Sequence, residues 1–152
     1  MDQVKIIVDT NIIFSALLSS NNTIVKLLID DFENLQFFSC NFLNVELKKH
    51  HEKLAKYSKL SSSALVEAEE LLLHKIIFIN ERLLPSNLFL QTEELLASID
   101  TKDTPFVALT FYLKATLWTG DMKLYNGLKA KNFDNVITSK ELAQIVDNLD
   151  NH

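Results

Sequence analysis

Short apolar runs, rich in β-branched and aromatic residues, alternate along this chain with longer stretches in which apolar residues recur at helical spacing. The short runs, which we predict as strands, occupy residues 4–8, 36–40, 76–79, 116–119 and 136–138. Because these runs are almost continuously apolar, they are typical of strands buried on both faces of a parallel sheet. Strands that alternate with helices indicate βαβ units. The sequence therefore predicts an α/β fold with a mainly parallel sheet.

The stretches between these runs are predicted as helices. They span residues 10–18, 23–32, 41–57, 64–75, 87–98, 103–114, 121–131 and 139–149. The helix over 41–57 is amphipathic and carries Leu43, Leu47 and Leu54 on its apolar face. Neither an internal repeat nor a linker interrupts the pattern. We therefore expect a single domain over 1–152, with the last few residues frayed.

Composition limits the class of protein. Of the 152 residues, 47% are hydrophobic and 23% are charged, as in an ordinary globular domain. The single Cys40 excludes an internal disulfide and a multi-cysteine zinc site. No segment approaches the roughly 18 apolar residues of a membrane span, and the N-terminus lacks the basic start of a secretory signal. We expect a cytoplasmic protein. The net charge of −5 argues against broad attraction to nucleic acid.

Four acidic residues lie at predictable places in this pattern. Asp9 follows the first predicted strand, and Asp121 follows the fourth. Glu46 lies in the helix after the second strand, and Asp103 opens the helix over 103–114. In a parallel sheet, the ends of strands and the starts of the following helices share one edge. Carboxylates gathered there would repel one another unless a divalent cation lay between them.

The acids also have a purely structural interpretation, because aspartate is favoured as a helix N-cap. Asp9, Asp103 and Asp121 each stand at the start of a predicted helix. If they bind metal instead, an all-carboxylate site favours Mg²⁺ or Mn²⁺ over zinc. Such a site suits phosphodiester hydrolysis, in which the cation activates water and neutralises the leaving oxygen.

Three motifs carry a resemblance to a known family. They are Val-Asp-Thr-Asn at 8–11, the segment 100–109 that opens a late helix, and Thr-Gly-Asp at 119–121. With these motifs in this order, the chain resembles the PIN-domain family of metal-dependent nucleases over most of its length. The closest resemblance is to the compact prokaryotic members that are toxins of toxin–antitoxin pairs.

The resemblance implies a fold, an activity and partners. The implied fold is a three-layer α/β/α sandwich whose five-stranded sheet has the order 3-2-1-4-5. The implied activity is that of an endoribonuclease, which hydrolyses RNA phosphodiester bonds with water activated by Mg²⁺ or Mn²⁺. The implied partners are a small antitoxin protein, which would place Arg or Lys in the acidic site, and a second copy of the chain in a homodimer.

By position, the resemblance also assigns roles to single residues. Those implied to bind metal and act in catalysis are Asp9, Glu46, Asp103 and Asp121. Thr10 and Thr119 match hydroxyl positions beside the metal, and Asn11 matches a position that orients the first acid. Asp100 is an additional acid that could be an outer ligand or a helix N-cap, and we favour the cap.

Basic residues include one departure from the family pattern. Lys123 stands where many relatives carry a further acid, which puts a second metal in question. The most basic stretch, 48–59, could be a solvated helix face or a contact to the RNA backbone. The candidate RNA contacts are Lys48, Lys49, Lys53 and Lys123.

Two other functions stay open at this stage. A catalytically degenerate chain of the same fold could bind RNA or a protein without cutting. A phosphotransfer protein would instead need Asp-x-Asp after the first strand or an aspartate after the third. After the first strand, Asn11 stands where Asp-x-Asp needs its second aspartate. After the third strand the chain has Asn-Glu-Arg at 80–82 and no aspartate, so both sites argue against phosphotransfer.

Overall fold

The five predicted strands form one parallel sheet in the order β3-β2-β1-β4-β5. The computed structural model describes residues 3–18, 22–30 and 32–150. The strands are β1 (Val4–Val8), β2 (Leu35–Cys40), β3 (Ile76–Ile79), β4 (Thr116–Trp118) and β5 (Val136–Ile137). Both the parallel pairing and the predicted strand order are therefore confirmed.

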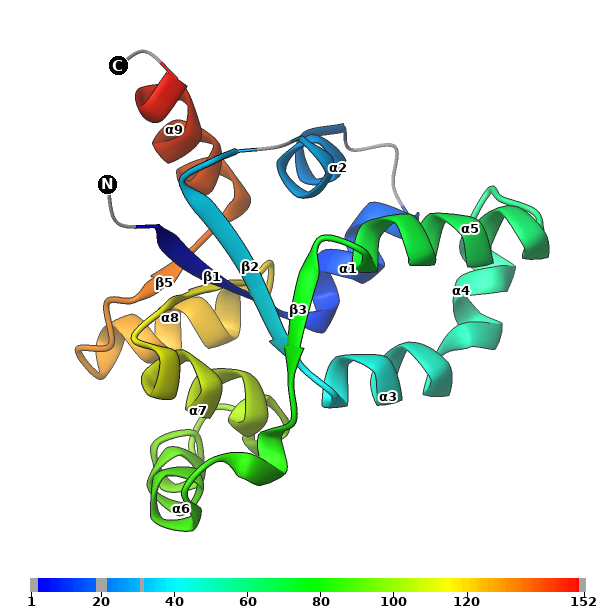
Figure 1. The fold of residues 1–152 in the computed structure, drawn as a ribbon. Coiled ribbons are helices and arrows are strands. Elements are labelled where there is room, and N and C mark those ends of the chain that lie inside the picture. The colour runs from blue at the N-terminus through cyan, green and yellow to red at the C-terminus, as the bar shows by residue number, and fades with distance from the viewer. Residues whose placement is uncertain (1–2, 19–21, 31, 151–152) are drawn as a thin grey trace.

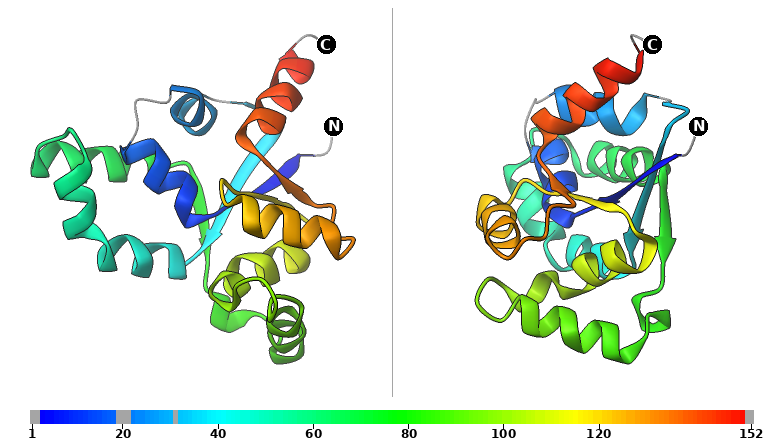
Figure 2. Two further views of the ribbon diagram at one scale, coloured as in Figure 1. Left: turned by 180° about the vertical axis from the view of Figure 1, so that it is seen from behind. Right: turned by 90° about the vertical axis from the view of Figure 1, so that its left-hand side faces the viewer.

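Helices cover the two faces of the sheet (Figures 1 and 2). Helix α7 (Thr104–Leu113) packs on β1, β2 and β4, with α6 (Ser86–Leu95) against its outer side. The other layer includes α1 (Thr10–Leu18), α2 (Asn22–Ile29), α5 (Ser62–Leu73) and α9 (Ser139–Asp150), and α8 (Met122–Ala130) contacts β5. The remaining elements are α3 (Phe42–Lys49), α4 (His51–Tyr57), η1 (Glu81–Leu83) and η2 (Thr101–Asp103). This is the predicted α/β/α sandwich.

The core lies between these layers and explains the continuous apolar runs. Ile6, Ile7 and Val8 of β1 are completely buried, because helices cover both faces of this central strand. Residues 106–109 of α7 are also all buried, so this helix has no solvated face in its middle turn. Packed side chains thus surround the carboxyl end of the central strand, which Asp9 follows.

The prediction of one continuous helix over 41–57 is wrong, because the helix is interrupted at His50. The backbone there has φ −102° and ψ 13°, which ends α3 and starts α4 in another direction (Figure 1). The His50 ring packs edge-on against Phe14 of α1, with 5.7 Å between ring centroids. Both short helices contact α1, and the predicted apolar residues Leu47 and Leu54 are buried on either side of the break.

Several other helix ends differ from the prediction. Helix α5 spans Ser62–Leu73 and not 64–75, and α6 ends at Leu95 and not at 98. Helix α2 ends at Ile29, not at 32, and residue 31 lies outside the described residues. The expected frayed end is helical as far as the structure describes it, because α9 continues to Asp150, while 151–152 lie outside the described residues.

Within the described residues, no single helix is long and apolar enough to cross a membrane. Helix α1 and Thr23–Ile29 reach that length and composition only when joined across a bend of 119°.

Candidate metal centre

Asp9 is a buried carboxylate at the end of the central strand, with only 2% of its surface exposed. Its Oδ2 accepts hydrogen bonds from the Thr119 hydroxyl at 2.8 Å and from Asn11 Nδ2 at 3.0 Å. Burial raises the pKa of Asp9 from 3.8 to about 6; the Thr119 hydrogen bond opposes that rise, and the charge of Glu46 adds to it. A proton or a cation therefore stabilises this carboxylate.

Asn11 fastens the turn after β1 to the turn after β4. Its Nδ2 donates to Asp9, and its Oδ1 accepts from the Gly120 backbone N–H at 2.7 Å. A Cβ at position 120 would lie 3.2 Å from that Oδ1, so a side chain there would crowd the amide. The glycine of the Thr-Gly-Asp motif thus permits the close approach between the turn after β4 and the side chain of Asn11.

Glu46 reaches the same edge from α3. Its Oε1 accepts a hydrogen bond from the Thr10 hydroxyl at 2.6 Å, which ties α3 to the first turn of α1. The charge of Glu46 helps to raise the pKa of both Asp9 and Asp103. The structure therefore places the predicted glutamate with the aspartates, although its helix carries no sharp motif.

Asp103 stands at the N-terminus of α7 without serving as its cap. Its side chain makes no capping hydrogen bond, and its Oδ2 is buried with no hydrogen-bond partner among the described residues. The pKa of Asp103 is raised from 3.8 to about 8. Burial is the largest cause, and the charges of Asp9, Asp100, Asp121 and Glu46 raise it further. A buried carboxylate oxygen without a partner is costly unless a ligand satisfies it.

Asp100 and Asp121 do serve as caps. Asp100 Oδ1 accepts from the Lys102 backbone N–H at 3.0 Å at the start of η2, as predicted. Asp121 Oδ1 accepts from the N–H groups of Lys123 at 3.0 Å and Leu124 at 3.3 Å at the start of α8. For Asp121 the structural interpretation is therefore correct, yet its charge also acts on Asp103.

The chemistry of these side chains fits a hard divalent cation. The side chains whose charges act on Asp103 are all carboxylates, the ligands that Mg²⁺ and similar ions prefer. As the side chains stand, no three acidic, histidine or cysteine residues in the described part of the chain converge closely enough to hold an ion. One oxygen of Glu46 accepts from Thr10 and one oxygen of Asp121 accepts from backbone N–H groups of α8.

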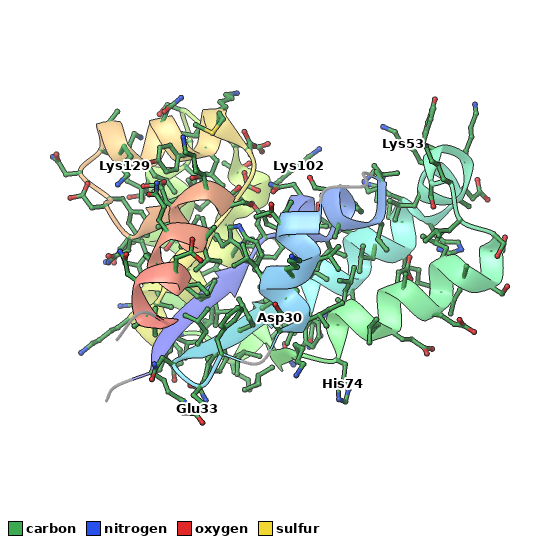
Figure 3. The ribbon with its side chains drawn as sticks, turned by 90° about the horizontal axis from the view of Figure 1, so that it is seen from above. Asp30, Glu33, Lys53, His74, Lys102 and Lys129 are labelled. Carbon is green, nitrogen blue, oxygen red and sulfur yellow. The ribbon has the colours of Figure 1, made fainter. Side chains whose placement is uncertain are left out.

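The predicted basic residues lie at the surface. Lys48, Lys49 and Lys53 are exposed, and the break at His50 puts Lys53 on a separate helix from the other two. Lys123 is exposed in the first turn of α8. Figure 3 shows Lys53 and Lys102 toward one edge of the molecule and Glu33 at the opposite edge.

Comparisons with known proteins now identify the family. The family model described as PIN domain matches residues 7–141, which is most of the chain. The chain belongs to the PIN-domain family. The fold of this PIN domain is shared by a solved structure of VapBC2 from Rickettsia felis, bound to a DNA fragment from their promoter. The TM-score is 0.64 at 18% identity, covering 89% of this chain and 97% of that one. A search of curated proteins finds no match.

Two residues of this PIN domain near the site were missed from the sequence. Lys102, between Asp100 and Asp103, is exposed and lies beside the acids. Glu81 follows β3 and accepts a hydrogen bond from the first residue of α3. The position of Glu81 after a strand is a usable signal, because Asp9 and Asp121 follow strands too.

Proposed function

We propose that this PIN domain is a divalent-metal-dependent endoribonuclease that hydrolyses RNA phosphodiester bonds. The observation that carries the proposal is the buried, unpartnered Oδ2 of Asp103, surrounded by the charges of Asp9, Asp100, Asp121 and Glu46 at the carboxyl edge of a PIN-family sheet. A cluster so destabilised without a cation, in a family of metal-dependent nucleases, supports metal-assisted hydrolysis more than a structural role.

In this proposal Asp9, Asp103 and Asp121 hold Mg²⁺ or Mn²⁺, and Glu46 holds the metal or orients the attacking water. When bound, the cation would lower the pKa of water and neutralise charge on the phosphate oxygens. Thr119 and Asn11 fix the orientation of Asp9 through its Oδ2.

Two further residues support the site. Thr10 holds Glu46 by its hydroxyl, and Asp100 shapes the turn before Asp103 while adding negative charge.

The RNA backbone would bind along exposed lysines at the edge of the site. Lys102 and Lys123 occupy equivalent places, because the backbone N–H of each is held by the aspartate two residues earlier. Their side chains are exposed, and no ion pair involves them among the described residues. Lys48, Lys49 and Lys53 would extend this contact across α3 and α4. Such lysines offset the repulsion between phosphate and an acidic protein.

We also propose a small antitoxin as protein partner and a homodimer as the assembly, in a cytoplasmic setting. The fold shared with the VapBC2 structure supports the antitoxin by analogy, since that protein is part of a complex. A basic side chain from such a partner would satisfy the Asp103 oxygen that lacks a partner in the described chain.

A non-catalytic PIN domain that binds RNA or protein is the second candidate. The observation that favours it is Lys123 in the first turn of α8, where its ammonium group would disfavour a second cation near Asp121.

RNA cleavage by the purified chain across a Mn²⁺ and Mg²⁺ titration tests the proposal. Metal-dependent cleavage that both Asp9→Asn and Asp121→Asn abolish is the expected result. RNA binding without cleavage at any metal concentration would favour the second candidate. Equal cleavage by the variants would show a contaminating nuclease and remove support for both residues.

A further inference from the structure

The N-terminus of α3 lacks a cap of its own. Asn41, which precedes the helix, has helical torsion angles of φ −62° and ψ −22° and makes no side-chain capping hydrogen bond. The first N–H groups of a helix have no partner within the helix and need one from outside. The partner of the first N–H of α3 comes from the segment that follows β3.

Glu81 supplies that partner. It begins η1 just after β3, and β3 pairs with β2 up to the Cys40–Ile79 register, where α3 follows. The Phe42 backbone N–H donates to Glu81 Oε2 at 3.4 Å. A carboxylate at this place is favoured by the positive end of the helix dipole.

A second observation places the Glu81 charge at the same junction. Burial raises the pKa of the Cys40 thiol to about 12, and the charge of Glu81 is the next cause of that rise. Cys40 is the last residue of β2, one residue before Asn41. The Glu81 carboxylate therefore lies over the connection between β2 and α3.

The position of α3 matters because this helix carries Glu46. Phe42 also packs against Phe106 of α7, with 6.1 Å between ring centroids, so the start of α3 contacts the helix that Asp103 precedes. A shift of this helix start would move Glu46 relative to its hydrogen-bond donor Thr10.

We infer that Glu81 is a positioning residue of the metal centre, which fixes Glu46 by capping α3 from the short helix η1 after β3. This inference rests on the proposed function, in which Glu46 serves the metal or the attacking water. The alternative is that Glu81 only stabilises the fold, in which case the effect of its replacement on Mn²⁺ affinity is independent of Glu46.

A double-mutant cycle separates these two roles. Mn²⁺ affinity is measured by calorimetry on the full chain, with RNA cleavage as a second readout, for Glu81→Ala in the native and Glu46→Gln backgrounds. We expect Glu81→Ala to weaken Mn²⁺ binding about 10-fold in the native background, at the lower end of the range for partners that orient metal ligands. In the Glu46→Gln background the effect should fall below about twofold, because the ligand that it positions is gone.

Two further variants guard against misfolding as the cause. Glu81→Gln keeps an oxygen that can accept from Phe42, so it should recover most of the Mn²⁺ affinity lost in Glu81→Ala. Glu93→Gln changes an exposed glutamate on α6 and should leave affinity unchanged.

Equal losses in both backgrounds, or no loss in either, would overturn the inference alone. The proposed function is tested separately, by Mn²⁺ binding and RNA cleavage of the native chain and of the Glu46→Gln variant. A native chain that takes up no Mn²⁺ would overturn the proposed function and the inference together. If Glu46→Gln binds Mn²⁺ and cleaves as the native chain does, the proposed role of Glu46 fails.

Discussion

The hydroxyl of Thr119 donates to the Oδ2 of Asp9 across 2.8 Å and so joins the ends of β4 and β1. The same hydroxyl oxygen accepts from the Asp121 backbone N–H at 3.1 Å. A completely buried threonine thus connects two acids of the candidate metal centre. Its hydrogen bond holds the pKa of Asp9 below the level that burial alone would give.

Replacing this hydroxyl should weaken the fold and the site together. Thr119→Val keeps the shape but leaves Asp9 Oδ2 with Asn11 as its remaining side-chain donor, so we expect a loss of about 1–3 kcal/mol in the free energy of unfolding at neutral pH. The pKa of Asp9 should also rise. Denaturant unfolding and NMR titration check both results. Thr119→Ser, which retains the hydroxyl, is the control, and a Thr119→Val chain as stable as the Ser variant would contradict the prediction.

The stability of the metal-free chain should fall as the pH rises. Asp103 has its pKa raised to about 8 in the folded chain, and Asp9 to about 6, against 3.8 as the ordinary value. Each carboxyl binds more protons when folded, so its contribution is complete below pH 3.8 and is lost as the pH rises through the folded pKa. Each pKa unit corresponds to about 1.4 kcal/mol before solvent screening.

Denaturant unfolding between pH 5 and 9 without divalent ions measures this loss. Asp103→Asn cannot ionise there, so its stability should change less between roughly pH 6 and 8 than that of the native chain. Added Mn²⁺ should restore the stability of the native chain at high pH but not that of the variant. A native chain whose stability rises with pH over this interval would contradict the account.

The strands and three of the four acids could be predicted from the sequence, because both depend on local pattern. Continuous apolar runs mark buried parallel strands, and Asp9, Asp103 and Asp121 stand at element junctions. The strand order is a long-range property, and only the family resemblance indicated it. The break at His50 coincides with a contact to Phe14, 36 residues earlier, and no local pattern encodes such a contact.

The residues missed near the site have the same explanation. The hydrogen bond between Phe42 and Glu81 joins positions 39 residues apart. From the sequence, Asp121 is either a metal ligand or a helix cap. In the structure one of its oxygens caps α8, and its charge also acts on Asp103. Local sequence cannot separate these roles, because a carboxylate has two oxygens.

Removing the lysines beside the acids should weaken RNA binding and reduce its salt dependence. For each of Lys102→Gln and Lys123→Gln, the slope of log affinity against log salt should fall by about 0.7, the value for one phosphate contact of a single strand. Binding is measured by fluorescence anisotropy in an Asp9→Asn background, which prevents cleavage.

Lys26→Gln, on α2, is the matched control for these lysines and should keep the slope of the parent chain. If all three variants have the same slope, phosphate contacts at Lys102 and Lys123 are excluded.

Gly127 should tolerate no side chain, because α8 packs closely there. A Cβ at position 127 would lie 2.7 Å from Cδ1 and 2.8 Å from Cγ1 of the buried Ile99. We expect Gly127→Ala to cost about 1–3 kcal/mol of stability through overpacking. In Ile99→Ala, which removes the contacted atoms, the added methyl group should cost less. Thermal unfolding of the four chains gives the coupling, and an equal cost in both backgrounds would refute this packing.

The most direct test of the metal centre is the number of protons released when Mn²⁺ binds, from calorimetry at pH 7 in buffers of different ionisation enthalpy. Because the pKa of Asp103 is about 8 without metal, this carboxyl is mostly protonated at that pH and must lose its proton to become a ligand. We expect about one proton to be released by the native chain and by Asp30→Asn, a control at an exposed acid just after α2. Asp103→Asn should bind Mn²⁺ weakly and release none. Tight binding by Asp103→Asn, or binding by the native chain without proton release, would contradict the account.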